Sequence, residues 1–358
     1  MSLDLSEQRG GESIDASNLL ASASRAQSLC RLRREASVRD LLTPDDARLD
    51  DQRRYALRTL LRAIVGTIGG DIQDHAHRTL TQRGATAAAQ ALTRIEAYHI
   101  MPAVERCLGQ DTVVAGELIE RVTLDLIGSA LPSGIVAAQG APWPAGHRTL
   151  DQRLLALRQA EGRRQAPPDQ PPYAIDLTAE CQARFVWWIA AAIARAADAD
   201  GNARVALDRA IADAGGQVLA GHDEGEGLEG IAARLALSLD LRGDLLVPIV
   251  EHCLGERRIV LLVAILAHAL GVEGATMRTM IVDPADPRLW LVLRALDLPR
   301  ETVARLGYAV CEADRRRDVE MFADRLDAIM AISPDAADGV LANLRLPADF
   351  RAALDLQS

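Results

Sequence analysis

Residues 257–306, RRIVLLVAILAHALGVEGATMRTMIVDPADPRLWLVLRALDLPRETVARL, decide the fold class of this chain. Apolar residues recur every three or four positions in this segment, a spacing that is typical of amphipathic helices. A half-buried strand would instead alternate apolar and polar residues. Short breaks interrupt this pattern at Gly271, Pro284 and Pro299. Their length is typical of the loops that connect packed antiparallel helices. The segment therefore predicts consecutive short helices over residues 257–270, 274–282, 287–296 and 301–313.

Helical spacing continues on both sides of this segment. On the N-terminal side, one face of a long helix is predicted by Leu57, Leu61, Ile64, Ile68 and Ile72. The glycines within that stretch indicate a kink or a close crossing with another helix. Only 3% of the chain is aromatic, and abundant unbranched Leu and Arg lose little rotamer freedom in a helix. We therefore predict an all-α protein, with antiparallel packed helices in two helical subdomains.

Proline and glycine residues divide the chain between residues 132 and 172. The run APPDQPP over residues 166–172 is typical of a stiff, extended connection, and a short helix near residues 150–160 fits between the breaks. We expect a frayed N-terminus over residues 1–15, an N-terminal helical domain over 16–131, a Pro/Gly-rich linker over 132–172 and a C-terminal helical domain over 173–358.

An internal echo indicates stacked helix pairs in the C-terminal half. Ala269-Leu270-x-Val272 is followed further along the chain by Ala295-Leu296-x-Leu298, and each copy precedes a capped helix start. Chance similarity between two Leu/Ala-rich helices is the alternative. If the echo is structural, the C-terminal half has HEAT-like, irregular α-solenoid character.

Several stretches resemble a bacterial family catalogued as domain of unknown function 2336. The resemblance lies in residues 222–239 (HDEGEGLEGIAARLALSL), 266–283 (LAHALGVEGATMRTMIVD), 291–306 (LVLRALDLPRETVARL) and, less closely, 49–80. It implies an all-helical, partly HEAT-like protein without an established activity. After Leu80 the chain departs from the family's usual run of short helix pairs.

Composition excludes several classes of function. The chain has no lysine, so Schiff-base and pyridoxal-phosphate lysines and the Walker lysine are excluded. A net charge of −10 argues against binding to nucleic acid or to an anionic membrane. The five cysteines are widely spaced without a CxxC pair, so they indicate neither a zinc site nor a disulfide framework. We also expect no cofactor and no other metal site. Without a signal peptide or a long apolar run, a cytoplasmic location is expected.

An acidic segment carries the first candidate site. His222, Asp223, Glu224 and Glu226 are side chains that can bind a metal ion, but their spacing matches no known metal motif. The favoured interpretation is a helix start, where Asp223 caps and the glutamates complement the positive end of the helix dipole.

The second candidate lies in the stretch DHAHRTL over residues 74–80. His77 and His75 are candidate phospho-acceptors, because a neutral imidazole oriented by a nearby acid can accept phosphate. The favoured alternative is a solvated helical surface. The two histidines point to different helix faces and therefore cannot readily share one metal ion.

Two further features are candidate partner contacts. One is a basic cluster that can bind an acidic group through bidentate hydrogen bonds: Arg315, Arg316 and Arg317. The acidic residues next to this cluster favour the alternative that it is a solvated helix end. In the pair Trp187-Trp188 one indole faces inward, and Trp187 is the candidate interface anchor or rests on the linker.

The sequence contains no recognised catalytic motif, so we expect a helical interaction protein or regulatory scaffold rather than an enzyme. Its partner would be another protein, and a homodimer through an exposed Leu/Ala helix face stays open. A histidine phosphotransfer module using His77 or His75 is the alternative from another class. An enzyme would need a cleft with converging polar groups, and residues 222–229 are the place to look for one.

Overall fold

A computed structural model describes residues 49–132, 142–143, 148–165, 175–241, 245–347, 350–351 and 353. This part of the chain contains fifteen α-helices and no β-strand, which confirms the all-α prediction. The chain divides into two compact units, Met1–Asp50 and Asp51–Ser358, and the second is described below. The frayed N-terminus expected over residues 1–15 lies outside the described residues. Within them, no helix is both long enough and apolar enough to cross a membrane.

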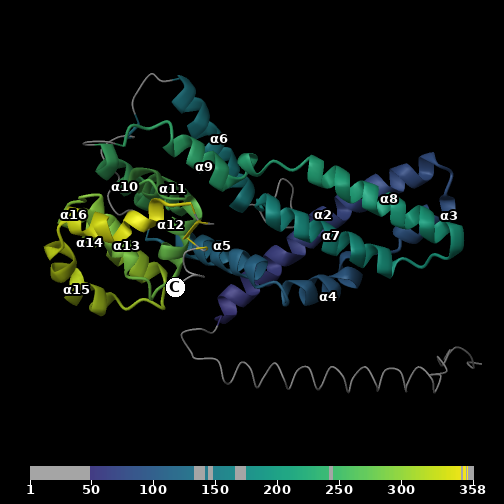
Figure 1. The fold of residues 1–358 in the computed structure, drawn as a ribbon, viewed down its shortest axis with the longest axis horizontal. Coiled ribbons are helices and arrows are strands. Elements are labelled where there is room, and N and C mark those ends of the chain that lie inside the picture. Colours follow the sequence, from purple (N-terminus) through teal and green to yellow (C-terminus); the bar gives the residue numbers. More distant parts are fainter. Residues whose placement is uncertain are drawn as a thin grey trace, which may run out of the picture. The chain divides into compact units, whose positions relative to one another are not determined.

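A first hydrophobic core forms around the longest helix, α2 (Asp51–Gln82). The buried face of α2 includes Leu61, Ile64, Ile68 and Ile72, as the spacing predicts. Gly69 lies at a crossing with α4 and α7, where a Cβ atom would make ordinary contacts of 3.6 Å with side-chain carbons of Ile100 and Ile189. The other helices of this core are α3 (Thr86–Leu92), α4 (Ala97–Leu108), α7 (Ala179–Ala196) and α8 (Gly201–Ala220). Figure 1 shows α7 and α8 beside α2.

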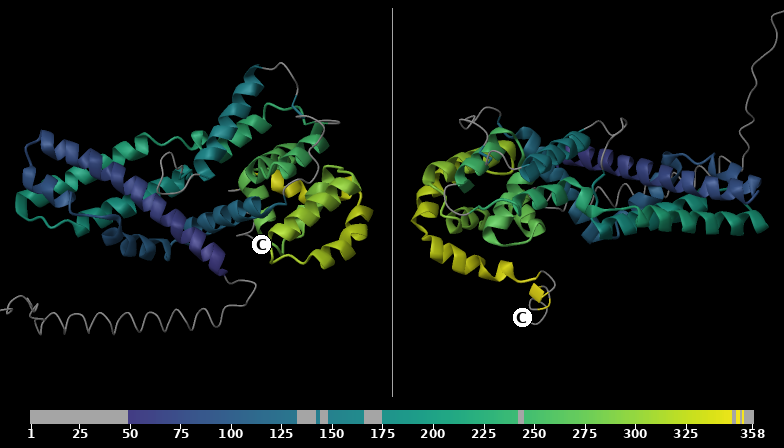
Figure 2. Two further views of the ribbon diagram at one scale, coloured as in Figure 1. Left: turned by 180° about the vertical axis from the view of Figure 1, so that it is seen from behind. Right: turned by 90° about the horizontal axis from the view of Figure 1, so that it is seen from above.

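A second core surrounds α11 (Ile259–Leu270), in which ten of twelve residues are buried. This helix contacts α5 (Thr112–Ala130), α9 (Leu228–Ala236), α10 (Leu246–Gly255), α12 (Gly274–Val282) and α13 (Arg288–Ala295). The remaining helices are α6 (Arg148–Gln165), α14 (Arg300–Ala313), α15 (Val319–Ala331) and α16 (Pro334–Leu341), with short 3-10 turns η2 (Glu224–Glu226) and η4 (Ala342–Arg345). In Figure 2 the yellow C-terminal helices lie next to the green α10–α13 region.

The two cores do not divide at residues 132–172, where the sequence predicts a linker between domains. α7 and α8 follow that segment, yet they pack against α2, which precedes it. The short helix expected near residues 150–160 is the longer α6, and it packs on α9 in the second core. Proline and glycine mark where helices end but not where the chain goes next, so the predicted boundary is corrected. α5 contributes its first half to one core and its second half to the other.

The two copies of the internal echo end in the same kind of turn. Gly271 after α11 and Asp297 after α13 both have positive φ, at 78° and 50°. In each copy the next backbone N–H returns to the helix, from Val272 to the Ala267 carbonyl and from Leu298 to the Leu293 carbonyl. This is the Schellman arrangement that commonly ends helices. It is a local likeness, and the solenoid character stays a prediction.

A buried ion cluster ties α2 to the second core. Asp314, whose side chain is 0% exposed, accepts a hydrogen bond of 3.1 Å from Nη2 of Arg53 on α2. Arg316 also donates to Asp314, and Arg317 Nη2 donates to the Ile281 carbonyl oxygen at 2.7 Å. We call Arg53, Asp314, Arg316 and Arg317 the Asp314 cluster. It joins the first described helix to the loops that follow α12 and α14.

Candidate functional site

A pocket with a volume of about 650 Å³ opens between α5, α9, α11 and α12, and we call it the α9–α11 pocket. Its walls are largely apolar and include Leu124, Val260 and Val263. Alanines on the facing helices, such as Ala233 on α9 and Ala264 on α11, leave the space between them open. The volume lies within the range of about 300 to 1,000 Å³ that is usual for ligand pockets.

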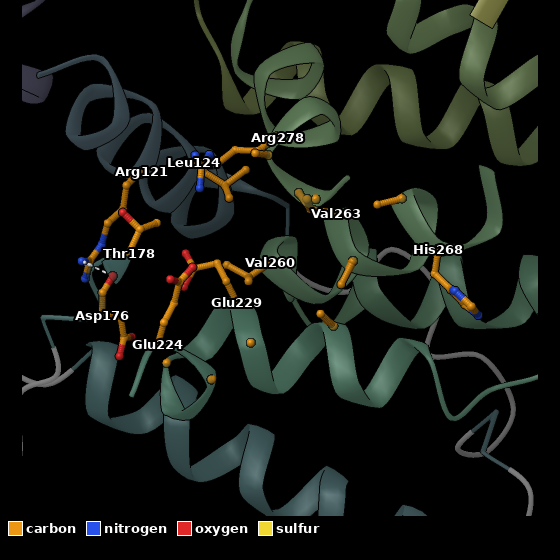
Figure 3. A pocket seen from close by; sticks show the side chains of 18 of the residues that line it. Arg121, Leu124, Asp176, Thr178, Glu224, Glu229, Val260, Val263, His268 and Arg278 are labelled. Atoms are coloured by element: carbon orange, nitrogen blue, oxygen red, sulfur yellow. Dashed lines mark hydrogen bonds between the residues drawn. The ribbon is translucent and has the colours of Figure 1, made fainter. Parts of the chain in front are cut away.

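Polar side chains gather at one end of this pocket. Figure 3 shows Arg121, Asp176, Thr178, Glu224 and Glu229 on one side of the view, with His268 at the opposite side. Val260 and Val263 lie between these two ends. The polar groups come from three separate places in the chain: α5, the segment before α7, and the segment from η2 to α9. The pocket is therefore amphiphilic, with an apolar wall that leads to a charged end.

Arg164 on α6 supports the charged end from behind. Its Nη1 lies 2.5 Å from Oε1 of Glu229, and its Nη2 lies 2.9 Å from Oδ1 of Asp125. Burial by itself raises the pKa of Glu229, but the charges of Arg164 and Arg121 outweigh it and lower that pKa. Burial lowers the pKa of Arg164, but the charges of Glu229 and Asp125 outweigh it and raise that pKa. Glu229 is thus held as an ionised partner of Arg164.

Within the described ranges, Asp176 has one carboxylate oxygen without a hydrogen-bond donor. Its side chain is 8% exposed and lines the pocket, and its φ is +35°, which is uncommon for a residue with a side chain. Among the described residues, no donor hydrogen-bonds to its Oδ2 atom, and Nη1 of Arg164 is 4.0 Å away. Burial raises the pKa of Asp176, while the charges of Arg121 and Arg164 oppose that rise. A buried oxygen with spare accepting capacity therefore belongs to the wall of the pocket.

Arg121 fixes the backbone on which Asp176 sits. Its Nη1 donates to the carbonyl oxygens of Ile175 and of Asp176, the second at 3.0 Å. Burial lowers the pKa of Arg121, and so does the charge of Arg164, while neighbouring carboxylates raise it. At least one N–H group of Arg121 therefore holds the backbone that leads into α7 and is not available to a ligand.

Glu117 and Glu224 accept hydrogen bonds from neutral groups. Oε2 of Glu117 lies 3.2 Å from the Thr178 hydroxyl and 3.1 Å from the sulfur of Cys181. Oε2 of Glu224 accepts from the backbone N–H of Ala179 at 2.9 Å, at the start of α7. Burial raises the pKa of Cys181 to about 12, so this thiol stays protonated and is not a nucleophile at neutral pH.

Gly230 lets η2 pack closely on α9. A Cβ atom at this position would lie 2.7 Å from the Gly225 carbonyl oxygen and 3.0 Å from the Glu224 carbonyl oxygen. Real Cβ atoms do not approach backbone so closely, and a side chain here would push the turn away. Gly230 therefore positions the turn that carries Glu224.

Gly225, Gly227 and Gly230 also have the spacing G-x-G-x-x-G at the start of a helix. In dinucleotide-binding proteins this spacing follows a β-strand and holds a pyrophosphate at the helix N-terminus. In the described part of this chain no strand precedes it. The Leu228 N–H at the start of α9 instead hydrogen-bonds the Asp176 carboxylate. A carboxylate of the chain itself thus lies where a phosphate would bind.

The acidic segment proposed from the sequence is divided between structural contacts and the pocket. Asp223 caps η2 through the Gly225 N–H at 2.8 Å, as the helix-start interpretation predicts. His222 Nε2 lies 3.0 Å from the Leu177 carbonyl oxygen, and Glu226 lies 3.6 Å from Arg234. Only Glu224 of the four predicted candidates lines the pocket. No group of three His, Cys, Asp or Glu side chains converges as a metal ion requires within the described ranges.

The two candidate phospho-acceptors lie within α2. Nη2 of Arg78 lies 3.0 Å from Nδ1 of His75. A guanidinium can only donate, so Nδ1 accepts and the hydrogen of the neutral ring is on Nε2. With this tautomer the lone pair of Nδ1 is engaged by Arg78. Phosphotransfer at His77 or His75 stays a prediction.

The candidate partner contacts have mixed surroundings. Arg317 is 3% exposed and serves the Asp314 cluster, so it is a structural residue rather than a partner contact. Arg316 shares that cluster and is partly accessible, whereas Arg315 is exposed. Trp188 packs on Phe185, while Trp187 is 47% exposed and lies beside Gly215 on α8. Contact of Arg315 or Trp187 with a partner stays a prediction.

Comparisons of the chain with known protein families, characterised proteins and solved structures give no match. The resemblance to domain of unknown function 2336 therefore stays an expectation.

Proposed function

We propose that this protein is a non-catalytic helical scaffold, and that the α9–α11 pocket holds an apolar segment of a partner protein. The observation that carries the proposal is the pocket itself, whose apolar wall of small residues lies between helices and ends at charged groups. Concave, mostly apolar sites with a few placed polar groups are typical of binding sites.

The contacts of Glu229, Glu224 and Cys181 favour binding over catalysis. A general base or a nucleophile must be free to take a proton or to attack a substrate. Glu229 is engaged by Arg164, and Glu224 by the start of α7. The Cys181 thiol is protonated and contacts Glu117. These groups position the walls of the pocket, which is the role that a scaffold requires.

The rim of the pocket offers a place from which to capture the partner. Leu237 lines the pocket, and its side chain is 68% exposed. An exposed leucine at the edge of an apolar pocket is well placed to touch a bound segment. Val205 on α8 is exposed to a similar degree, 70%, and does not line the pocket. It provides the matched control position.

The test is site-specific photo-cross-linking in living cells. A photoreactive phenylalanine at position 237 should capture one protein in stoichiometric yield, and the same residue at position 205 should not. Ala233→Trp should abolish the capture, because Ala233 is exposed, lines the pocket and can accept a ring that fills it. Ala87→Trp, at an exposed alanine on α3, is the control. Equal capture from both positions, or capture that survives Ala233→Trp, would overturn the proposal.

A further inference from the structure

The charges that line the α9–α11 pocket are unequal. Its lining includes two guanidinium groups, Arg121 and Arg278, and four carboxylates, a formal excess of two negative charges: Glu117, Asp176, Glu224 and Glu229. A concave site with apolar walls strengthens such an imbalance, because less water is present to screen it. The charged end of the pocket therefore attracts a positive group.

Contacts within the protein leave this imbalance in place. Nε of Arg278 donates to Oε2 of Glu120 at 3.1 Å, and Arg164 offsets the charge of Glu229 in the same way. Arg121 donates to two backbone carbonyl oxygens, which leave its positive charge in place. Glu117 and Glu224 instead accept from a hydroxyl, a thiol and a backbone N–H, which leave their negative charges in place.

Asp176 supplies the second, independent observation. More than nine-tenths of its side chain is buried, it lines the pocket, and its Oδ2 has no hydrogen-bond donor among the described residues. A buried acceptor without a donor is unfavourable. A ligand that donates to Oδ2 would remove that cost. An ionised carboxylate or an ether could not, because neither carries a donor.

The geometry favours an organic cation over a metal ion. No three ligating side chains converge in the described part of the chain, so the carboxylates are too dispersed for a coordination shell. A guanidinium or ammonium group needs only one or two close acceptors and tolerates a dispersed negative field. The apolar wall formed by Val260, Val263 and Ala264 would cover a hydrocarbon stem that carries such a group.

We infer that the α9–α11 pocket selects a basic side chain, arginine or lysine, of the bound partner, with Asp176 as its principal acceptor. This inference rests on the proposed scaffold function and names the chemistry of its partner. The aliphatic stem lies along the α11 wall, and the charged head reaches Oδ2 of Asp176.

The experiment uses three small probes built on six-carbon chains: hexylguanidinium, 1-hexanol and hexanoate. Binding to the full chain is measured by calorimetry and by NMR shifts. Hexylguanidinium should bind about tenfold to a hundredfold more tightly than 1-hexanol, which is the usual range for a hydrogen bond to a charged group. Hexanoate should bind weakest of the three, and added salt should weaken the binding of hexylguanidinium.

Asp176→Asn keeps the size of the side chain and removes its charge, so it should erase the preference for hexylguanidinium. Asp208→Asn is the matched control, because Asp208 is an exposed aspartate paired with Arg204 on α8. Equal affinities for all three probes, tightest binding of hexanoate, or an unchanged preference in Asp176→Asn would overturn the inference.

The outcomes separate this inference from the proposed function. If position 237 captures a partner but hexylguanidinium is not preferred, the scaffold stands and the cation inference fails. If hexylguanidinium is preferred but no partner is captured, the pocket binds a small organic cation and the assignment to a partner side chain fails. Where both succeed, replacing the captured partner's basic residue by Gln should abolish the cross-link.

Discussion

Two buried aspartates in this protein, Asp314 and Asp176, have similar burial but opposite surroundings. Asp314 accepts from Arg53 at 3.1 Å and from Nη2 of Arg316 at 2.8 Å, and its side chain is fully buried. Asp176 is 8% exposed, and its Oδ2 has no hydrogen-bond donor within the described residues. One carboxylate is enclosed by arginines that donate to it, and the other lies in the wall of a pocket.

The pKa values of the two groups follow this difference. Burial alone raises the pKa of Asp314, but hydrogen bonds and charge from Arg316, together with the charge of Arg53, bring it below its usual value. Burial also raises the pKa of Asp176, and there the opposing arginines do not overcome it. The comparison teaches that burial alone does not distinguish a structural carboxylate from a binding one. What distinguishes them is the number of hydrogen-bond donors that reach the carboxylate.

The largest expected effect on the free energy of unfolding is at Asp314, the enclosed carboxylate. Asp314→Ala removes the buried carboxylate that Arg53, Arg316 and Arg317 share, so we expect a loss of about 3 to 5 kcal/mol in the free energy of unfolding. Urea unfolding followed by circular dichroism measures it. Asp208→Ala, at an exposed position of α8, should change the free energy of unfolding by less than about 0.5 kcal/mol. A loss below about 1 kcal/mol for Asp314→Ala would show that the cluster is not sealed.

The helices themselves could be predicted from the sequence because their signals are local. Thr178 precedes α7 and accepts from the Cys181 N–H, as an N-cap does. The helix predicted over residues 274–282 is observed as α12 with the same bounds. Periodicity identifies the apolar face of a helix but not its partner, which is why the packing of α7 and α8 on α2 was not foreseen.

The candidate site was foreseen only in part, for a related reason. Acidic residues near 222–229 were recognised as a place for a cleft, and Glu224 and Glu229 do line the pocket. Arg121, Arg164 and Asp176 were missed because they come from three distant segments and match no motif. The spacing of Gly225, Gly227 and Gly230 was a readable sign of a tight turn at the start of α9. Only the structure shows that Asp176 lies against that turn.

An intermediate effect on stability is expected at Gly230, which positions the turn at the charged end of the α9–α11 pocket. Gly230→Ala places a Cβ atom 2.7 Å from the Gly225 carbonyl oxygen, and backbone cannot move aside cheaply. We expect a loss of about 1 to 3 kcal/mol from overpacking. We also expect weaker binding of hexylguanidinium, since the turn carries Glu224. Gly216→Ala on α8 has no atom within 4 Å and should stabilise the protein by about 0.5 to 1 kcal/mol. If both variants lost stability equally, the close approach of η2 to α9 would be refuted.

The smallest effect, and the one of opposite sign, is expected at Asp176. A carboxyl group with a raised pKa in the folded state binds its proton more tightly there than in the unfolded chain. The wild-type protein therefore loses stability as the pH rises from the unfolded value of about 3.9 through the raised folded value. Asp176→Asn does not carry this cost, so it should be more stable than wild type at pH 7, by about 1 kcal/mol or less.

That difference should nearly vanish as the pH falls towards 3, below the unfolded value of about 3.9, where Asp176 is largely protonated in both states. Thermal unfolding of the two proteins across pH 3 to 8 measures it, and hexylguanidinium should stabilise the wild type but not the variant at pH 7. The groups that face Asp176 are Arg121 on α5, Arg164 on α6, and Glu229 with the Leu228 N–H on α9. Asp314 has the opposite sign, because its lowered pKa makes its charge stabilising above about pH 4 and costs stability as the pH falls. If Asp176→Asn were instead destabilised at pH 7 like Asp314→Ala, both aspartates would be structural, and the pocket would have no acceptor left to offer a ligand.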